Sequence, residues 1–75
     1  MDIEYRAVYK KRNNTKGPQY HDGALTAELK ELHTSVAGIV KHWPSVVSAT
    51  IYSYPSRKPI VTYMKEGAAI RYTTA

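Results

Sequence analysis

One segment of helical periodicity interrupts an otherwise strand-like chain of 75 residues. Between positions 25 and 40, apolar residues recur every three or four positions and cover an arc of roughly 100° on a helical wheel. Pro44 ends the pattern, because the residue before a proline disfavours helix. Asp22 or Thr26 can cap the start. The pattern predicts one helix over about residues 24–42, with this core-facing stripe: Leu25, Leu29, Leu32, Val36, Ile39 and Val40.

The flanking segments alternate with period two, which is typical of strands with one buried face. Residues 2–10 form the first such segment, and residues 46–73 contain three more that are joined by short links. Short links favour an antiparallel meander. We therefore expect an α+β fold, a small antiparallel β-sheet in the order β-α-β-β-β with one helix packed on one face. Residues 1–75 should form a single domain, with Trp43 closing one end of its core.

Between the first strand and the helix, residues 11–23 carry repeated turn signals. Asn13-Asn14, Gly17-Pro18 and Asp22-Gly23 all favour turns or loops. A connection of this length is longer than usual, and such loops often carry function. The sequence predicts a long basic loop at residues 11–23.

Several function classes find no support in the residues. The chain has no cysteine, a scattered set of four glycines and no nucleophile motif. The histidines His21, His33 and His42 lack the spacing of a metal-binding helix. The acidic start resembles no signal peptide, and no apolar run is long enough for a membrane. We expect a non-enzymatic, cytoplasmic protein that needs no cofactor or metal and does not enter membranes.

Charge points to a class of partner. The chain has 11 Lys and Arg against 6 Asp and Glu, a net charge of +5. Residues 5–21 contain five cations and no acid, and residues 32–65 contain four cations and no acid. Clustered positive charge attracts phosphate backbones or acidic proteins. The sequence thus predicts a positively charged face.

Two segments combine the residue types that contact nucleic acids. Residues 10–16 supply cations, amides and a hydroxyl, with tyrosines on either side. Residues 52–59 repeat the mixture of tyrosine, hydroxyl and cation, and the two segments form one continuous surface if the strand order brings them side by side. The candidate binding residues are Arg6, Lys10, Lys11, Arg12, Asn13, Asn14, Lys16, Tyr20, Tyr54, Arg57 and Lys58.

The sequence supports two readings of function. In the first, a small basic protein binds DNA or RNA mainly through the phosphate backbone, and six such contacts predict a log–log salt slope of roughly −5 on duplex DNA. In the alternative, a phage- or mobile-element-type inhibitor or adaptor docks its tyrosine-containing basic surface on an acidic patch of a host nucleic-acid-processing or defence protein. Homodimerisation through the edge at residues 68–73 is compatible with either reading.

Overall fold

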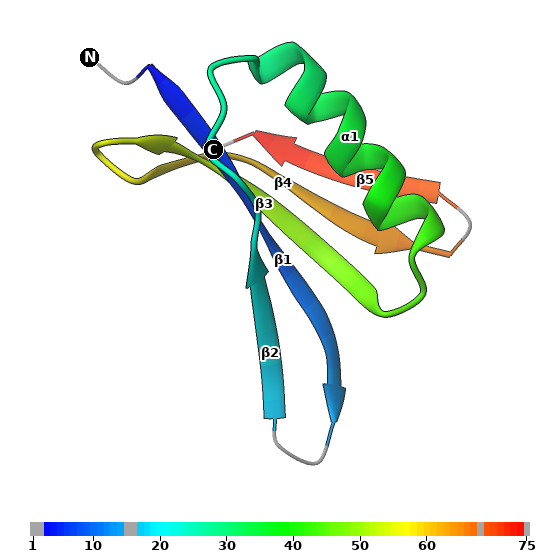
Figure 1. Cartoon of the computed structure of the whole chain (residues 1–75). Helices are drawn as coiled ribbons and strands as arrows, with labels where there is room; N and C mark the ends of the chain where they lie inside the picture. The colour runs from blue at the N-terminus through cyan, green and yellow to red at the C-terminus, as the bar shows by residue number, and fades with distance from the viewer. Residues whose placement is uncertain (1–2, 15–16, 68, 75) are drawn as a thin grey trace.

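The computed structural model describes residues 3–14, 17–67 and 69–74. Within these residues the chain forms five strands and one helix, shown in Figure 1. In chain order the elements are β1 (Glu4–Asn14), β2 (Gly17–Asp22), α1 (Leu29–His42), β3 (Val46–Tyr54), β4 (Lys58–Glu66) and β5 (Ala69–Thr74).

All five strands belong to one antiparallel sheet in the order β2-β1-β3-β4-β5. Tyr9 of β1 lies opposite His21 of β2 and Ala49 of β3. The same row continues through Tyr63 of β4 to Tyr72 of β5. Directly opposite residues share a face of the sheet, so this row defines the face that we call the helix face.

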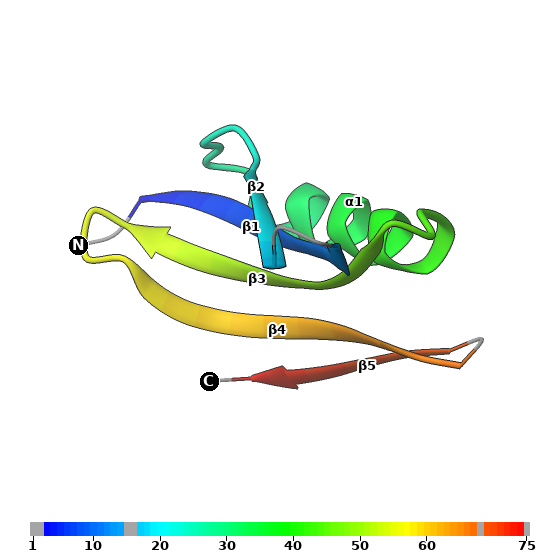
Figure 2. The same ribbon diagram turned by 90° about the horizontal axis from the view of Figure 1, so that it is seen from below.

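The helix packs on that face against β1, β3, β4 and β5, as Figures 1 and 2 show from two directions. Small residues of the sheet, Ala7 and Ala49, lie under α1 and are each 1% exposed. The expected α+β fold, a small antiparallel sheet with one helix on one face, is confirmed. Its buried apolar core comprises Ala7, Tyr9, Val36, Val40, Val46, Ala49, Ile51, Val61 and Tyr63.

The element order differs from the expected one because residues 11–23 are not a loop. β1 continues to Asn14, and β2 pairs with it to form a hairpin, so the order is β-β-α-β-β-β. β2 contains Pro18 and polar residues on both faces, and a strand without an apolar face gives no period-two hydrophobic signal. Among the described elements, β2 contacts β1 alone, and Pro18 suits such an edge strand.

The helix begins later than predicted, at Leu29 instead of about residue 24. Residues 23–26 use their backbone groups on β1 instead: Gly23 N–H donates to the Ala7 carbonyl at 2.8 Å, and Thr26 N–H donates to the Tyr5 carbonyl at 2.9 Å. Leu25 is therefore left outside the helix and is 41% exposed. Among the described residues, no helix is long and apolar enough to span a membrane.

Trp43 does not close the core as expected. It follows the last residue of α1, and 55% of its surface is exposed. The neighbouring Val46, at 2% exposed, fills the adjacent buried position instead. Trp43 thus covers the outside of the core end and leaves its centre to aliphatic residues.

We expect Ile51 to carry a large share of the stability. It is fully buried at the centre of the sheet, so Ile51→Ala should lower the free energy of unfolding by about 2–5 kcal/mol and Ile51→Val by about 1 kcal/mol. Ile3 is 65% exposed and provides the matched control, with a change below about 0.5 kcal/mol for Ile3→Ala. Urea denaturation measures all three. Equal losses at the two positions would contradict the assigned core.

Candidate nucleic-acid interface

Strand pairing separates the two predicted basic segments. Lys11 pairs with Val46 at the start of β3, whereas Glu4 pairs with Tyr54 at its end. The turn that carries Arg57 therefore lies beside the first residue of β1, seven residues and about 23 Å along the strand from Lys11. In Figure 1 the β1–β2 hairpin and the β3–β4 turn point in different directions. Lys11 and Arg12 therefore do not form one continuous surface with the β3–β4 turn.

Arg12, one of the predicted phosphate ligands, is engaged at the end of the helix. Its Nη2 donates to the Pro44 carbonyl at 3.1 Å, and its backbone N–H donates to the Ser45 carbonyl at 2.7 Å. Lys65 Nζ donates to the Trp43 carbonyl at 2.8 Å in the same region. Both accepting carbonyls lie just after His42, the last residue of α1, so these two cations hold β1 and β4 to the α1–β3 connection.

Other predicted residues are dispersed. Lys11 lines a cavity of about 270 Å³ on the helix face together with Trp43. Lys58 is exposed at the first position of β4, opposite Ser53. Three predicted side chains lie outside the described part of the structure, those of Asn13, Asn14 and Lys16.

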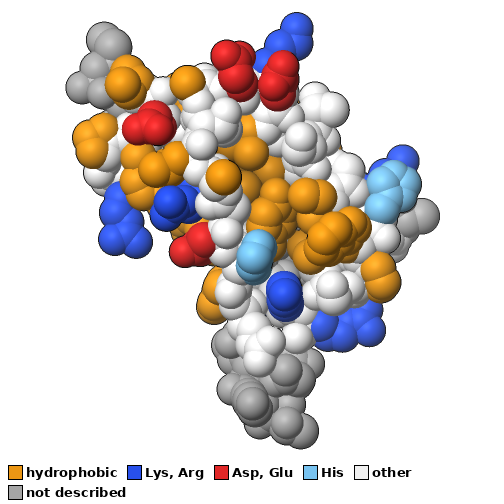
Figure 3. Space-filling model, in the orientation of Figure 1, with side chains coloured by type: hydrophobic (Ala, Val, Ile, Leu, Met, Phe, Trp, Pro, Cys, Tyr) orange, Lys and Arg blue, Asp and Glu red, His pale blue; other side chains and the backbone are white. Residues whose placement is uncertain are grey.

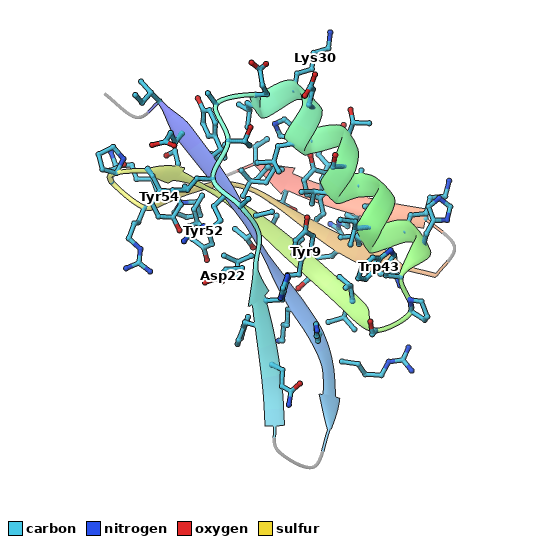
Figure 4. All side chains as sticks on the ribbon, in the orientation of Figure 1. Tyr9, Asp22, Lys30, Trp43, Tyr52 and Tyr54 are labelled. Carbon is cyan, nitrogen blue, oxygen red and sulfur yellow. The ribbon has the colours of Figure 1, made fainter. Side chains whose placement is uncertain are left out.

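The face opposite α1, which we call the open face, carries a groove of about 820 Å³. Four predicted residues line it, together with three that the sequence analysis did not select. We call it the tyrosine groove, and it is lined by Arg6, Val8, Tyr20, Asp22, Tyr52, Tyr54 and Arg57. Figure 4 shows Asp22, Tyr52 and Tyr54 gathered beside β1.

The strand order explains the shape of the groove. Arg6 and Val8 on the middle strand β1 form its floor. Asp22 lies opposite Val8 on β2, and Tyr52 lies opposite Arg6 on β3. The two walls therefore come from strands on either side of β1, about 10 Å apart. Lys10 lies at one end, directly opposite Tyr20.

Arg6 is held against a tyrosine ring. Its Cζ lies 5.4 Å from the centroid of the Tyr54 ring, within the range of a cation–π contact. Its Nε is buried and has no hydrogen-bond partner within the described structure. A buried donor without an acceptor costs about 1–3 kcal/mol. An acceptor that enters the groove beside Arg6 can offset this cost.

Arg57 adopts a backbone conformation that disfavours a side chain. Its φ is 60°, in the left-handed region. A residue with a Cβ in this region costs roughly 1–2 kcal/mol compared with glycine. The turn thus carries a guanidinium at the groove in spite of a local backbone cost, and such positions are often functional.

Cations do not form a single patch on the helix face. Figure 3 views this face, and the described Lys and Arg side chains fall in several places that other side chains separate. On the open face, Arg71 lies 3.9 Å from Glu66 in an exposed ion pair. The tyrosine groove itself combines two guanidinium groups with one carboxylate. Its lining is aromatic and carries charges of both signs, whereas the sequence predicted a positively charged face and Asp22 was not among the candidate binding residues.

Two of the three histidines contact tyrosines on the helix face, and the third lies at the end of α1. His33 Nδ1 and the Tyr63 hydroxyl form a hydrogen bond, and His21 lies 6.3 Å from Tyr9 between ring centroids. His42 is the last residue of α1. Within the described residues, no three His, Cys, Asp or Glu side chains gather where a metal ion could bind.

A second cavity, of about 690 Å³, lies on the helix face beside the first turns of α1. Its lining includes Leu29, Ile60, Tyr63 and Tyr72, and is mainly apolar and aromatic. Two of its polar groups, those of His33 and Tyr63, are hydrogen-bonded to each other. This cavity offers less polar chemistry than the tyrosine groove.

Comparison with known proteins adds no functional assignment, since no protein-family model, curated protein or solved structure matches the chain. The candidate site therefore depends on its geometry alone. The alternation of β3 already put Tyr52 and Tyr54 on one face. Nothing in the sequence indicated that Val8 and Asp22 line the groove, because their contact depends on the pairing of β2 with β1.

Buried tyrosines make the stability sensitive to high pH. Burial raises the pKa of Tyr9 above its usual 10.0. The pKa of Tyr63 is also raised, mainly by burial and to a smaller extent by the charge of the neighbouring Tyr72. A raised pKa favours the neutral form in the folded state, so this stabilisation is complete below about pH 10 and is lost as pH rises through the folded pKa. The free energy of unfolding should therefore fall above about pH 10.

Denaturation between about pH 8 and pH 11 measures the effect. Tyr9→Phe should reduce the loss, because phenylalanine does not ionise. Tyr20→Phe is the matched control, since Tyr20 is 63% exposed, and it should leave the pH dependence unchanged. An equal response of the two variants would contradict the burial argument.

Proposed function

We propose that this protein is a small, non-enzymatic nucleic-acid-binding protein and that the tyrosine groove is its contact surface. The observation that carries the proposal is the interleaving of tyrosine rings and guanidinium groups along one groove of an open sheet face. Nucleic acids offer flat bases that stack on aromatic rings and phosphates that bind cations.

The proposed surface differs from the basic loop favoured by the sequence. Arg12 is engaged with Pro44, and Lys11 lines the cavity on the helix face, so neither side chain lies in the groove. Arg6, Lys10 and Arg57 lie in or at the end of the groove instead. Three phosphate contacts on a single strand predict a log–log salt slope of about −2. This slope is much shallower than the one of roughly −5 expected for six contacts on duplex DNA.

Fluorescence titration of short oligonucleotides at low and near-physiological salt tests the proposal. Lys10→Ala should weaken binding and make the salt slope on a single strand shallower by about 0.7, because one phosphate contact is lost. Lys30→Ala removes the same charge from the exposed side of α1, far from the groove, and should leave affinity almost unchanged. The absence of binding at low salt would exclude the proposed function.

Arg57→Gly separates binding from folding. Glycine relieves the left-handed strain but increases the entropy of the unfolded chain, so the free energy of unfolding should stay within about 1 kcal/mol of the parent. Oligonucleotide affinity should nevertheless fall several-fold, because a groove cation is gone. Unchanged affinity would remove Arg57 from the proposed interface.

Docking on an acidic protein surface is the second candidate. Tyrosine and arginine in a groove are also typical of interface hot spots. Protein binding should depend on one or two residues, so Tyr52→Ala would abolish it, whereas nucleic-acid binding should decline gradually as cations are removed.

β5 forms one edge of the sheet, where a second copy of the chain could pair with it. Analytical sedimentation of the protein alone and with oligonucleotide measures whether two copies associate.

A further inference from the structure

The tyrosine groove contains a carboxylate that binding to phosphate alone does not explain. Asp22 ends β2 on the wall of the groove, and it is exposed. Among the described residues it has no ion-pair partner, even though Arg6 and Arg57 line the same groove. A carboxylate repels phosphate, but it accepts hydrogen bonds from amino groups on base edges.

The groove is wide enough to admit a flat ring between its walls. Its walls are about two strand spacings, or roughly 10 Å, apart. Tyr52 and Tyr54 are half-buried on one wall and so present ordered rings, while Asp22 faces the groove from the other wall. Bases in a duplex are stacked and paired, so their faces are not available to such rings. An unpaired base can present both its face and its edge.

We infer that the groove binds an unpaired nucleobase that carries an exocyclic amino group, with Asp22 accepting a hydrogen bond from that group. This inference depends on the proposed nucleic-acid binding and adds the kind of base. The amino group of cytosine is a donor that lies beside an acceptor nitrogen, which matches a carboxylate next to arginine donors. Thymine and uracil have a carbonyl oxygen at this position, and Asp22 repels it.

Single strands of about eight cytidines or eight thymidines provide a matched pair, because they differ at the base edge that Asp22 would contact. In titrations at low salt and neutral pH, the parent protein should bind the cytidine strand about tenfold more tightly. A cytidine–guanosine duplex of the same length should bind more weakly than the cytidine strand.

Asp22→Asn should bring the ratio of the two affinities close to one and should raise the affinity for the thymidine strand, because a repulsive charge is removed. A gain of affinity cannot come from a misfolded variant. Glu4→Gln is the matched control: Glu4 lies on the open face opposite Tyr54 but is not among the residues that line the groove. It removes the same charge and should keep the preference for cytidine.

The outcomes distinguish this inference from the function on which it depends. Equal binding of both strands by the parent protein, or tighter binding of the duplex, would overturn base selection and leave nucleic-acid binding in place. Binding to none of the oligonucleotides would overturn both and would favour protein docking. A preference that persists in Asp22→Asn would falsify the role of Asp22.

Discussion

Tyr9 of β1 lies opposite Ala49 of β3, and Arg6 lies opposite Tyr52. The rest of the structure depends on this register. A slip of one residue would turn every side chain of β1 to the other face, burying Arg6 under the helix and exposing Tyr9. Burial of Ala7 and Tyr9 opposes such a slip, because it would remove both from the core. The same free energy that forms the core thus also orients the floor of the tyrosine groove.

The two faces of the sheet serve different purposes with the same strands. On the helix face, small residues at Ala7 and Ala49 let Val36 and Val40 of α1 pack closely, and both valines are fully buried. On the open face, the alternation of side chains along β1 and β3 places cations and tyrosines such as Arg6 and Tyr52. Core packing therefore holds the groove on rigid strands, which reduces the entropy lost when a ligand binds.

Particular elements show how far local patterns could predict the fold and the site. The helix, β3 and β4 followed from periodicity, because each buries an apolar face that leaves its pattern in the sequence. β5 is mostly exposed, and the turn at Glu66-Gly67 and the alternation of Ile70 with Arg71 indicated it instead. β2 left no such pattern, since its sequence is mostly polar and none of its described side chains is buried. The start of α1 was misplaced because the pairing of Thr26 with Tyr5 involves residues 21 positions apart, and backbone partners of this kind have no local signature.

Arg6, Tyr20, Tyr54 and Arg57 were selected for their chemistry, and their assembly into one groove came from strand order. The same order engaged Arg12 at the helix end and separated the two basic segments. Composition and period in the sequence were enough for the fold class, for most of the helix stripe that faces the core and for the absence of a thiol, whereas Leu25 and Trp43 were wrongly assigned to the core. Only the tertiary structure decided which charges and rings meet, because cross-strand neighbours are chosen by the burial of the whole sheet.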